Sequence, residues 1–165
     1  MINLEHYELC VCIANGMPDV LCSSKLSFQE NGKKVSLSLR AGEEAKAVVI
    51  DQCVCADNDT KCDGLFLCRR NKKHWMILIE LKGSDLQHAF EQLAYTRYKR
   101  PQYKDIEQLF MKNQPGQLKH DAFVVSNHQM PKNEMQKLEN NHNIRVKAIL
   151  FSEATRPTPD IREYL

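Results

Sequence analysis

The segment Trp75–Ile79 constrains the fold most, because its five consecutive residues are all apolar. Side chains alternate between the two faces of a strand, so an unbroken apolar run predicts a strand that is covered on both faces. Two charged residues, Glu80 and Lys82, follow the run, and Gly83 ends it. We therefore expect a buried central strand over residues 74–82 with two charged side chains on one face at its end.

Length and composition predict one domain. The chain has 165 residues, of which 42% are hydrophobic and 27% charged, and a chain of this size can bury a sufficient core. No apolar stretch approaches the roughly 18 residues of a membrane span, and the N-terminus lacks a basic-then-apolar signal pattern, so we expect a cytoplasmic protein without membrane contact. The net charge of +2 excludes binding of a polyanion through bulk charge, so a nucleic-acid partner requires locally arranged charge.

The expected elements before the central strand are extended, apart from one short helix. They are a helix over 4–15 ended by Gly16-Met17-Pro18, a hairpin of 25–29 and 35–40 around Asn31-Gly32, and strands over 45–55 and 62–69. After Gly83 the apolar spacing becomes helical, with an N-cap at Ser84 or Asp85. The expected elements there are helices over 86–98, 105–112 and 131–139, strands over 122–126 and 144–151, and an extended tail.

Strands first, followed by alternating strands and helices, predict an α/β fold with a mixed central sheet flanked by helices. We divide the single domain, residues 1–165, into an N-terminal helix and hairpin (1–44), a core (45–151) and a C-terminal tail (152–165).

Two carboxylates and a lysine are expected to meet at the polar end of the central strand. Asp63 opens the preceding strand, so a hairpin of the two strands places it beside Glu80 at one edge of the sheet. With the backbone carbonyl of Leu81, these carboxylates form an all-oxygen site suited to Mg²⁺ or Mn²⁺. Such an ion polarises a phosphoryl oxygen, and the Lys82 ammonium can position the attacking water or stabilise negative charge. This residue set predicts phosphodiester hydrolysis.

These residues resemble the PD-(D/E)xK nuclease superfamily, which includes restriction endonucleases, resolvases and many repair and phage-defence nucleases. The resemblance covers about residues 45–127 and rests on Asp63, on Glu80-x-Lys82 after an apolar strand, and on the amphipathic helix that follows. It implies a restriction-endonuclease-like core in which Asp63 and Glu80 bind the metal and Lys82 is the catalytic lysine. It also implies a nucleic-acid substrate, most simply DNA, and action as a homodimer or within a larger defence or repair assembly.

The sequence departs from the superfamily pattern in two places. Cys62 stands where many members have Pro before the first acidic residue. Some members supply a further acidic residue from their first helix, and that position has no unambiguous match here. Glu43 and Glu44 are the best candidates, with Asp51 behind them.

One side of the helix after Gly83 carries polar side chains, namely His88, Gln92, Tyr95 and Lys99. Some members of the superfamily carry Gln and Tyr spaced QxxxY after the lysine, and Gln92-x-x-Tyr95 matches that spacing imperfectly. We interpret this side as a stripe that contacts the DNA backbone, the alternative being an ordinary solvated helix face. The expected stripe continues in Arg97, Tyr98, Arg100, Tyr103 and Lys104.

The seven cysteines are expected to be reduced. Their odd number and the missing signal pattern are typical of a cytosolic protein. They form two C-x-C pairs, at Cys10/Cys12 and Cys53/Cys55, and no C-x-x-C, so packing as small hydrophobic residues is favoured over a zinc or iron–sulfur site.

Three functions follow in order of preference. The first is a metal-dependent endonuclease, the second is a catalytically inactive DNA- or protein-binding module on the same fold, and the third is a thiol-ligated metal protein.

Overall fold

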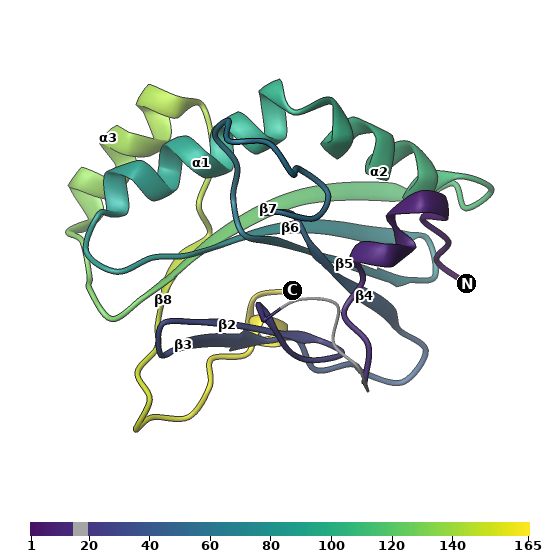
Figure 1. The fold of residues 1–165 in the computed structure, drawn as a ribbon, viewed down its shortest axis with the longest axis horizontal. Coiled ribbons are helices and arrows are strands. Elements are labelled where there is room, and N and C mark those ends of the chain that lie inside the picture. The colour runs from purple at the N-terminus through teal and green to yellow at the C-terminus, as the bar shows by residue number, and fades with distance from the viewer. Residues whose placement is uncertain (15–19) are drawn as a thin grey trace.

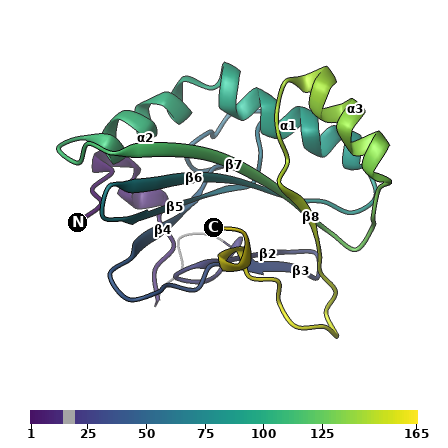
Figure 2. The same ribbon diagram turned by 180° about the vertical axis from the view of Figure 1, so that it is seen from behind.

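The computed structural model describes residues 1–14 and 20–165 and arranges them in three layers (Figure 1). Three helices cover one face of a five-stranded sheet, and a smaller three-stranded sheet with the C-terminal segment lies against the other face. Figure 2 shows the same layers from behind. The helices are α1 (Leu86–Lys99), α2 (Pro101–Met111) and α3 (Lys132–His142).

The five-stranded sheet is mixed, which confirms the predicted α/β class. Its strands, in spatial order, are β4 (Glu44–Val49), β5 (Gly64–Arg70), β6 (Lys73–Leu81), β7 (Gln117–Ser126) and β8 (Ala148–Phe151). The first three form an antiparallel meander, and β6, β7 and β8 run parallel to one another. The strand order therefore brings the start of β5 and the ends of β4, β6, β7 and β8 to one end of the sheet.

β6 is the buried central strand that the apolar run predicted. Met76 and Leu78 pack with α1 and α2 on the helical side, whereas Ile77 and Ile79 pack with the small sheet on the other. Residues of α1 on the predicted apolar stripe, such as Phe90, are fully buried in the helical layer.

The smaller sheet contains the predicted hairpin and forms the third layer. It comprises β1 (Cys22–Ser24), β2 (Ser27–Glu30) and β3 (Lys33–Ser36). Asn31 and Gly32 both have positive φ angles, as a two-residue turn between antiparallel strands requires. Phe28 of β2 packs against Gly64, where an added Cβ would lie 2.6 Å from the ring, so only glycine allows this close approach.

Several predicted boundaries are wrong, for local reasons. The expected strand 45–55 ends at Val49, because the chain then turns through Gln52, which has a positive φ. Pro101 does not separate two helices by a loop but occupies the first turn of α2, where a missing N–H costs nothing. β7 begins earlier than predicted, β8 begins later, and α3 extends to His142.

The N-terminal segment is less helical than predicted. In place of a helix over 4–15, a 3-10 helix, η1, covers Glu5–Cys10, and Val11 is extended and forms a bridge with Val48. The predicted stop at Gly16-Met17-Pro18 lies outside the described residues. At the other end of the chain, the tail is pinned to β3 by a backbone hydrogen bond from Ser36 to Pro159, and a second 3-10 helix, η2, covers Ile161–Tyr164.

The expectation of seven reduced thiols is wrong. Disulfides join Cys10 to Cys53 and Cys12 to Cys22, and the remaining thiols at positions 55, 62 and 68 are buried. Neither disulfide involves the central strand. The apolar pattern of the sequence gives no indication of which cysteines pair. Four of the seven cysteines are therefore oxidised, whereas the expectation of a cytosolic protein included reduced thiols at all seven. Within residues 1–14 and 20–165, no helix has the length and apolar character needed to cross a membrane.

Candidate functional site

Asp63 and Glu80 lie side by side where β5 begins and β6 ends. The strand pairing places Gly64 opposite Ile79, so the next pair outward is Asp63 and Glu80. Here side chains continue the ladder: the Asp63 N–H donates to Glu80 Oε2 at 3.1 Å, and the Leu81 N–H donates to Asp63 Oδ2 at 2.7 Å. The predicted meeting of the two carboxylates is thus present in the structure.

Both carboxyl groups are nearly inaccessible to solvent, with 6% of Asp63 and 2% of Glu80 exposed. Burial, reinforced by the nearby Glu30 carboxylate, raises the pKa of Asp63 to about 7. Burial and the Asp63 charge raise the pKa of Glu80 well above its usual value. Burial thus favours the protonated form of both carboxyl groups, and the Asp63 charge adds to this effect at Glu80.

Leu81 directs a backbone oxygen to the same place. Its N–H bonds the Asp63 side chain on the β5 side of the strand. In a strand the N–H and C=O of one residue point to the same side, so the Leu81 carbonyl also faces the carboxyl pair. The backbone of the next residue, Lys82, turns the other way, and its N–H donates to Val125 O of β7 at 2.8 Å.

The Lys82 side chain is held by α1. Its Nζ donates to Gln92 Oε1 at 3.0 Å, and Gln92 Nε2 in turn donates to the backbone carbonyl of Lys61 at 3.1 Å. Gln92 therefore connects the lysine to the segment that leads into Asp63. This role differs from the predicted DNA contact for Gln92, because both polar ends of its side chain are engaged within the protein.

The loop before Asp63 is fastened at several points. The Arg100 guanidinium forms two hydrogen bonds with the Asp57 carboxylate, one of 2.7 Å, and others with the carbonyls of Thr60 and Asp59. The bonds from Arg100 to the Asp57 carboxylate lower the pKa of Asp57 well below its usual value. The N–H of Cys62 donates to Thr96 Oγ1 on α1 at 2.7 Å. The position of Asp63 is thus fixed from α1 as well as from the sheet.

The other members of the expected DNA-contact stripe are exposed or half-buried, apart from two. His88, Tyr95 and Lys99 are exposed on α1, and His88 lies 3.2 Å from Glu91. Arg100 and Tyr103 are buried, so their assignment to the stripe is wrong: Arg100 binds the loop described above, and the hydroxyl of Tyr103 lies 2.7 Å from His120 Nδ1.

Glu43 and Glu44 do not join the carboxyl pair. β4 runs antiparallel to β5, so Glu44 faces Arg69 at the opposite end of the sheet, and their side chains approach to 2.7 Å. Glu43 pairs with Arg162 of the C-terminal segment. Asp51, the third candidate, lies at the correct end: its N–H and that of Ile50 both donate to the carbonyl of Asp63.

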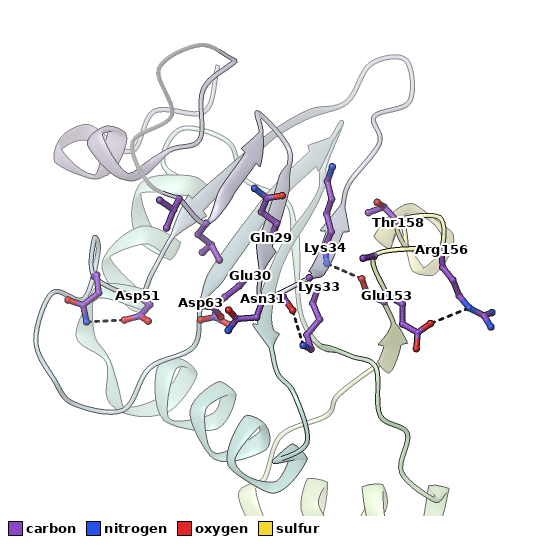
Figure 3. A pocket seen from close by; sticks show the side chains of 16 residues that line it. Gln29, Glu30, Asn31, Lys33, Lys34, Asp51, Asp63, Glu153, Arg156 and Thr158 are labelled. Carbon is purple, nitrogen blue, oxygen red and sulfur yellow. Dashed lines mark hydrogen bonds and ion pairs between the residues drawn. The ribbon is translucent and has the colours of Figure 1, made fainter.

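Glu30 is an acidic neighbour of the pair that the sequence pattern does not indicate. Glu30 follows Phe28 by two residues and therefore lies on the same face of β2. Phe28 in turn packs on Gly64, the residue after Asp63. The Glu30 side chain is therefore carried beyond the edge of the sheet to Asp63 (Figure 3), and its charge raises the pKa of both Asp63 and Glu80. Only the docking of the hairpin under β5 reveals this proximity, because the two segments are distant in the sequence.

The described residues contain no cluster of three or more His, Cys, Asp or Glu side chains arranged to hold a metal ion. The carboxyl pair has two such side chains, and its third donor is the main-chain oxygen of Leu81. Four cysteines form disulfides, including Cys53, which the sequence analysis considered as a possible thiol ligand.

Comparison of the chain with protein-family models, with curated proteins and with solved structures finds no match. The inferences below therefore rest on the geometry of this site.

Proposed function

We propose that the protein is a metal-dependent endonuclease that hydrolyses phosphodiester bonds in DNA. Its active site would be formed by Asp63, Glu80 and Lys82. The observation that carries this proposal is the pair of buried carboxyl groups at the end of the central strand, with a lysine on the same face of that strand. The antiparallel meander followed by a helix and a parallel strand supports a restriction-endonuclease-like core for residues 45–151.

The donors at this site fit Mg²⁺ or Mn²⁺. Two adjacent carboxyl groups with raised pKa values, excluded from water, are stabilised by a cation that replaces their shared proton. Mg²⁺ is commonly bound by one or two carboxylates together with waters and substrate phosphate, so Asp63, Glu80 and the Leu81 carbonyl form a sufficient set. When bound, the ion would polarise the phosphoryl oxygen and acidify a bound water.

The remaining residues position substrate and water. The Lys82 ammonium has three donors and uses one on Gln92, so two are left for the attacking water or a phosphate oxygen. Asp63 and Glu80 fix the orientation of their ligand through bonds to backbone N–H groups, which hold each carboxylate in one rotamer. The exposed His88, Tyr95 and Lys99 on α1 provide contacts to the DNA backbone farther from the cut.

Cleavage assays test the proposal. Labelled DNA and RNA would be incubated with the protein in Mg²⁺, in Mn²⁺ and in EDTA, alongside Asp63→Asn and Lys82→Ala. We expect cleavage that requires a divalent ion and falls by about 10²–10⁴-fold in each variant, the range typical of lost catalytic groups. Metal-dependent cleavage at the wild-type rate in both variants would show that the activity lies elsewhere.

The same assay separates a nuclease from an inactive binding module. A module predicts binding of DNA without cleavage in either metal and binding that survives Glu80→Gln. Cleavage that requires Glu80 excludes it.

A further inference from the structure

A pocket of about 770 Å³ opens beside Asp63 on the side away from α1. Three segments form its walls: the hairpin residues 29–34, the turn at 51–52 and the C-terminal stretch 152–158 (Figure 3). The pocket therefore meets the proposed catalytic site at Asp63, while Glu80 and Lys82 do not line it, and most of its walls come from segments outside the core.

The hairpin wall is fixed in position at both of its strands. On β2, Phe28 packs against Gly64 and Phe66 beneath the main sheet. On β3, the Lys34 N–H donates to Ser152 Oγ at 2.9 Å, and the Ser36 N–H donates to Pro159 O at 3.1 Å. These contacts join the hairpin tip to the C-terminal stretch, so the two walls form one continuous surface.

Charge is distributed unevenly along the pocket. Figure 3 shows the carboxylates of Asp51, Asp63 and Glu30 on one side of it. Lys33 and Lys34 occupy the middle, projecting from the hairpin, and Arg156 lies on the far side with Glu153, its Nε 3.6 Å from that carboxylate. The two hairpin lysines thus lie between the acidic side and the Arg156–Glu153 pair, with Lys33 Nζ donating to Asn31 O at 3.2 Å.

The recessed carboxyl groups restrict what can reach them. Asp63 lies in the wall of the pocket and is 6% exposed, and Glu80 lies behind it. A volume of this size accommodates a small molecule or a few nucleotides. A single strand is flexible and narrow enough to lie along such a recess, whereas duplex DNA is stiff and too wide to enter it as a duplex.

We propose that this pocket binds an unpaired nucleic-acid strand, with Lys33, Lys34 and Arg156 contacting the phosphates that flank the one beside Asp63. This inference rests on the proposed function and deepens it, because it makes single strands, flaps or frayed ends the substrate class. It also assigns the main backbone contacts to the hairpin and C-terminal stretch rather than to α1.

Fluorescence anisotropy in EDTA tests binding apart from cleavage. The probes are a fluorescein-labelled 12-nucleotide oligo-dT, the corresponding oligo-U and a 20-base-pair duplex. The variant is Lys33→Gln/Lys34→Gln, and the matched control is Lys132→Gln/Lys137→Gln, which removes two exposed lysines from α3. We expect the single strands to bind at least 10-fold more tightly than the duplex, and the hairpin variant to lose about 10-fold in affinity with a salt dependence lower by about 2, one for each lost phosphate contact.

The outcomes separate the two proposals. Equal affinity for duplex and single strand, no binding at all, or equal losses in the hairpin variant and its control would overturn the pocket assignment. If the hairpin variant still cleaves single strands in Mn²⁺ at the wild-type rate, the nuclease proposal stands and the pocket proposal fails. Tight binding through Lys33 and Lys34 with no cleavage in either metal gives the reverse result. Preference for oligo-dT or oligo-U identifies the substrate as DNA or RNA.

Discussion

The two ends of the five-stranded sheet differ in the partners that they provide for acidic side chains. At one end, Glu44 of β4 faces Arg69 of β5, and its carboxylate also accepts a hydrogen bond from the Ile2 N–H. At the other end, Glu80 of β6 faces another acid, Asp63. β5 thus lies beside a compensated carboxylate of β4 at one end, and at its other end Asp63 lies beside a second carboxyl group, on β6.

The pKa values follow this contrast. Partial burial favours the neutral form of Glu44, but the Ile2 N–H and the Arg69 guanidinium outweigh it and lower the pKa of that carboxyl group. At the other end, burial and the neighbouring carboxyl group both act to raise the pKa of Glu80. Like charges buried side by side reduce stability, and strongly raised carboxyl pKa values of this kind are typical of candidate functional sites.

The largest expected effect is the difference in catalysis between two matched substitutions. We expect Glu80→Gln to lower the cleavage rate by about 10³-fold, because it removes a charged metal ligand. Glu44→Gln, the same chemical change at the opposite end, should leave the rate within about 2-fold, a difference of less than ~0.5 kcal/mol in the barrier. Both are measured by cleavage of labelled DNA in Mn²⁺, with circular dichroism to confirm folding. Equal losses of cleavage rate in Glu80→Gln and Glu44→Gln would show that the two ends of the sheet do not differ in their contribution to catalysis.

Metal binding at the Asp63–Glu80 end of the sheet should raise the free energy of unfolding, and Glu44 at the other end should have no part in this effect. At a free Mn²⁺ concentration of 100 times its Kd, a ligand that binds only the folded state adds about 2.7 kcal/mol. For a domain of this length, that corresponds to a rise in Tm of roughly 5–10 °C. We expect this rise in the wild type and in Glu44→Gln at pH 7.5, and its loss in Asp63→Asn. A rise of the same size in Asp63→Asn would place the ion elsewhere.

Without metal, the two glutamines should change stability in opposite directions. Burial and the Asp63 charge raise the pKa of Glu80, so replacing Glu80 with the neutral Gln should stabilise the protein at pH 8. Glu44→Gln should destabilise it by about 1 kcal/mol, because it weakens a partly solvent-exposed pair with Arg69. Thermal unfolding in EDTA measures both differences. A less stable Glu80→Gln protein would show that the carboxyl pair contributes to folding.

The pH dependence of the free energy of unfolding tests the raised pKa at the Asp63–Glu80 end of the sheet. For an acid with a raised pKa, the folded state holds a proton that the unfolded state releases, so stability falls as pH rises from the unfolded value toward the folded one. For Asp63 that window runs from about 4 to about 7, because its pKa is raised to about 7. We expect the metal-free wild type to lose stability from pH 5 to pH 8, and Asp63→Asn to lose less. A flat wild-type profile would contradict the raised pKa.

The central part of this site was predictable because its determinants are local. The apolar run before Glu80, the turn between β5 and β6 and the period-2 alternation together place Asp63, Glu80 and Lys82 on one face. Glu30 was not predictable, since its position depends on a hairpin docking under a glycine more than thirty residues away in the sequence. Glu44, a candidate for a further acidic residue of the site, lies at the opposite end because β4 runs antiparallel to β5, so the first residue of β4 faces the end of β5.

The disulfides illustrate the same limit. Cysteine spacing constrains pairing only weakly, and Cys10 reaches Cys53 because the N-terminal segment runs antiparallel along the edge of β4, where Val11 bridges Val48. This pairing is a tertiary contact with no periodic signal in the sequence. The boundaries that failed, at Val49 and in the N-terminal 3-10 helix, lie close to this pairing.

The smallest effect concerns how Lys82 is held. Gln92→Ala removes the acceptor 3.0 Å from Lys82 Nζ and the donor to Lys61 O, so we expect about a 10-fold lower kcat, equivalent to ~1.4 kcal/mol, with KM little changed. Gln87→Ala, an exposed glutamine on the same helix, is the control. Gln92→Glu keeps an acceptor for the lysine but loses the donor to Lys61 O, so it should recover most of the rate if orientation of Lys82 matters. Equal rates in Gln92→Ala and Gln92→Glu, with the same fall in Tm, would instead assign Gln92 to anchoring the loop before Asp63.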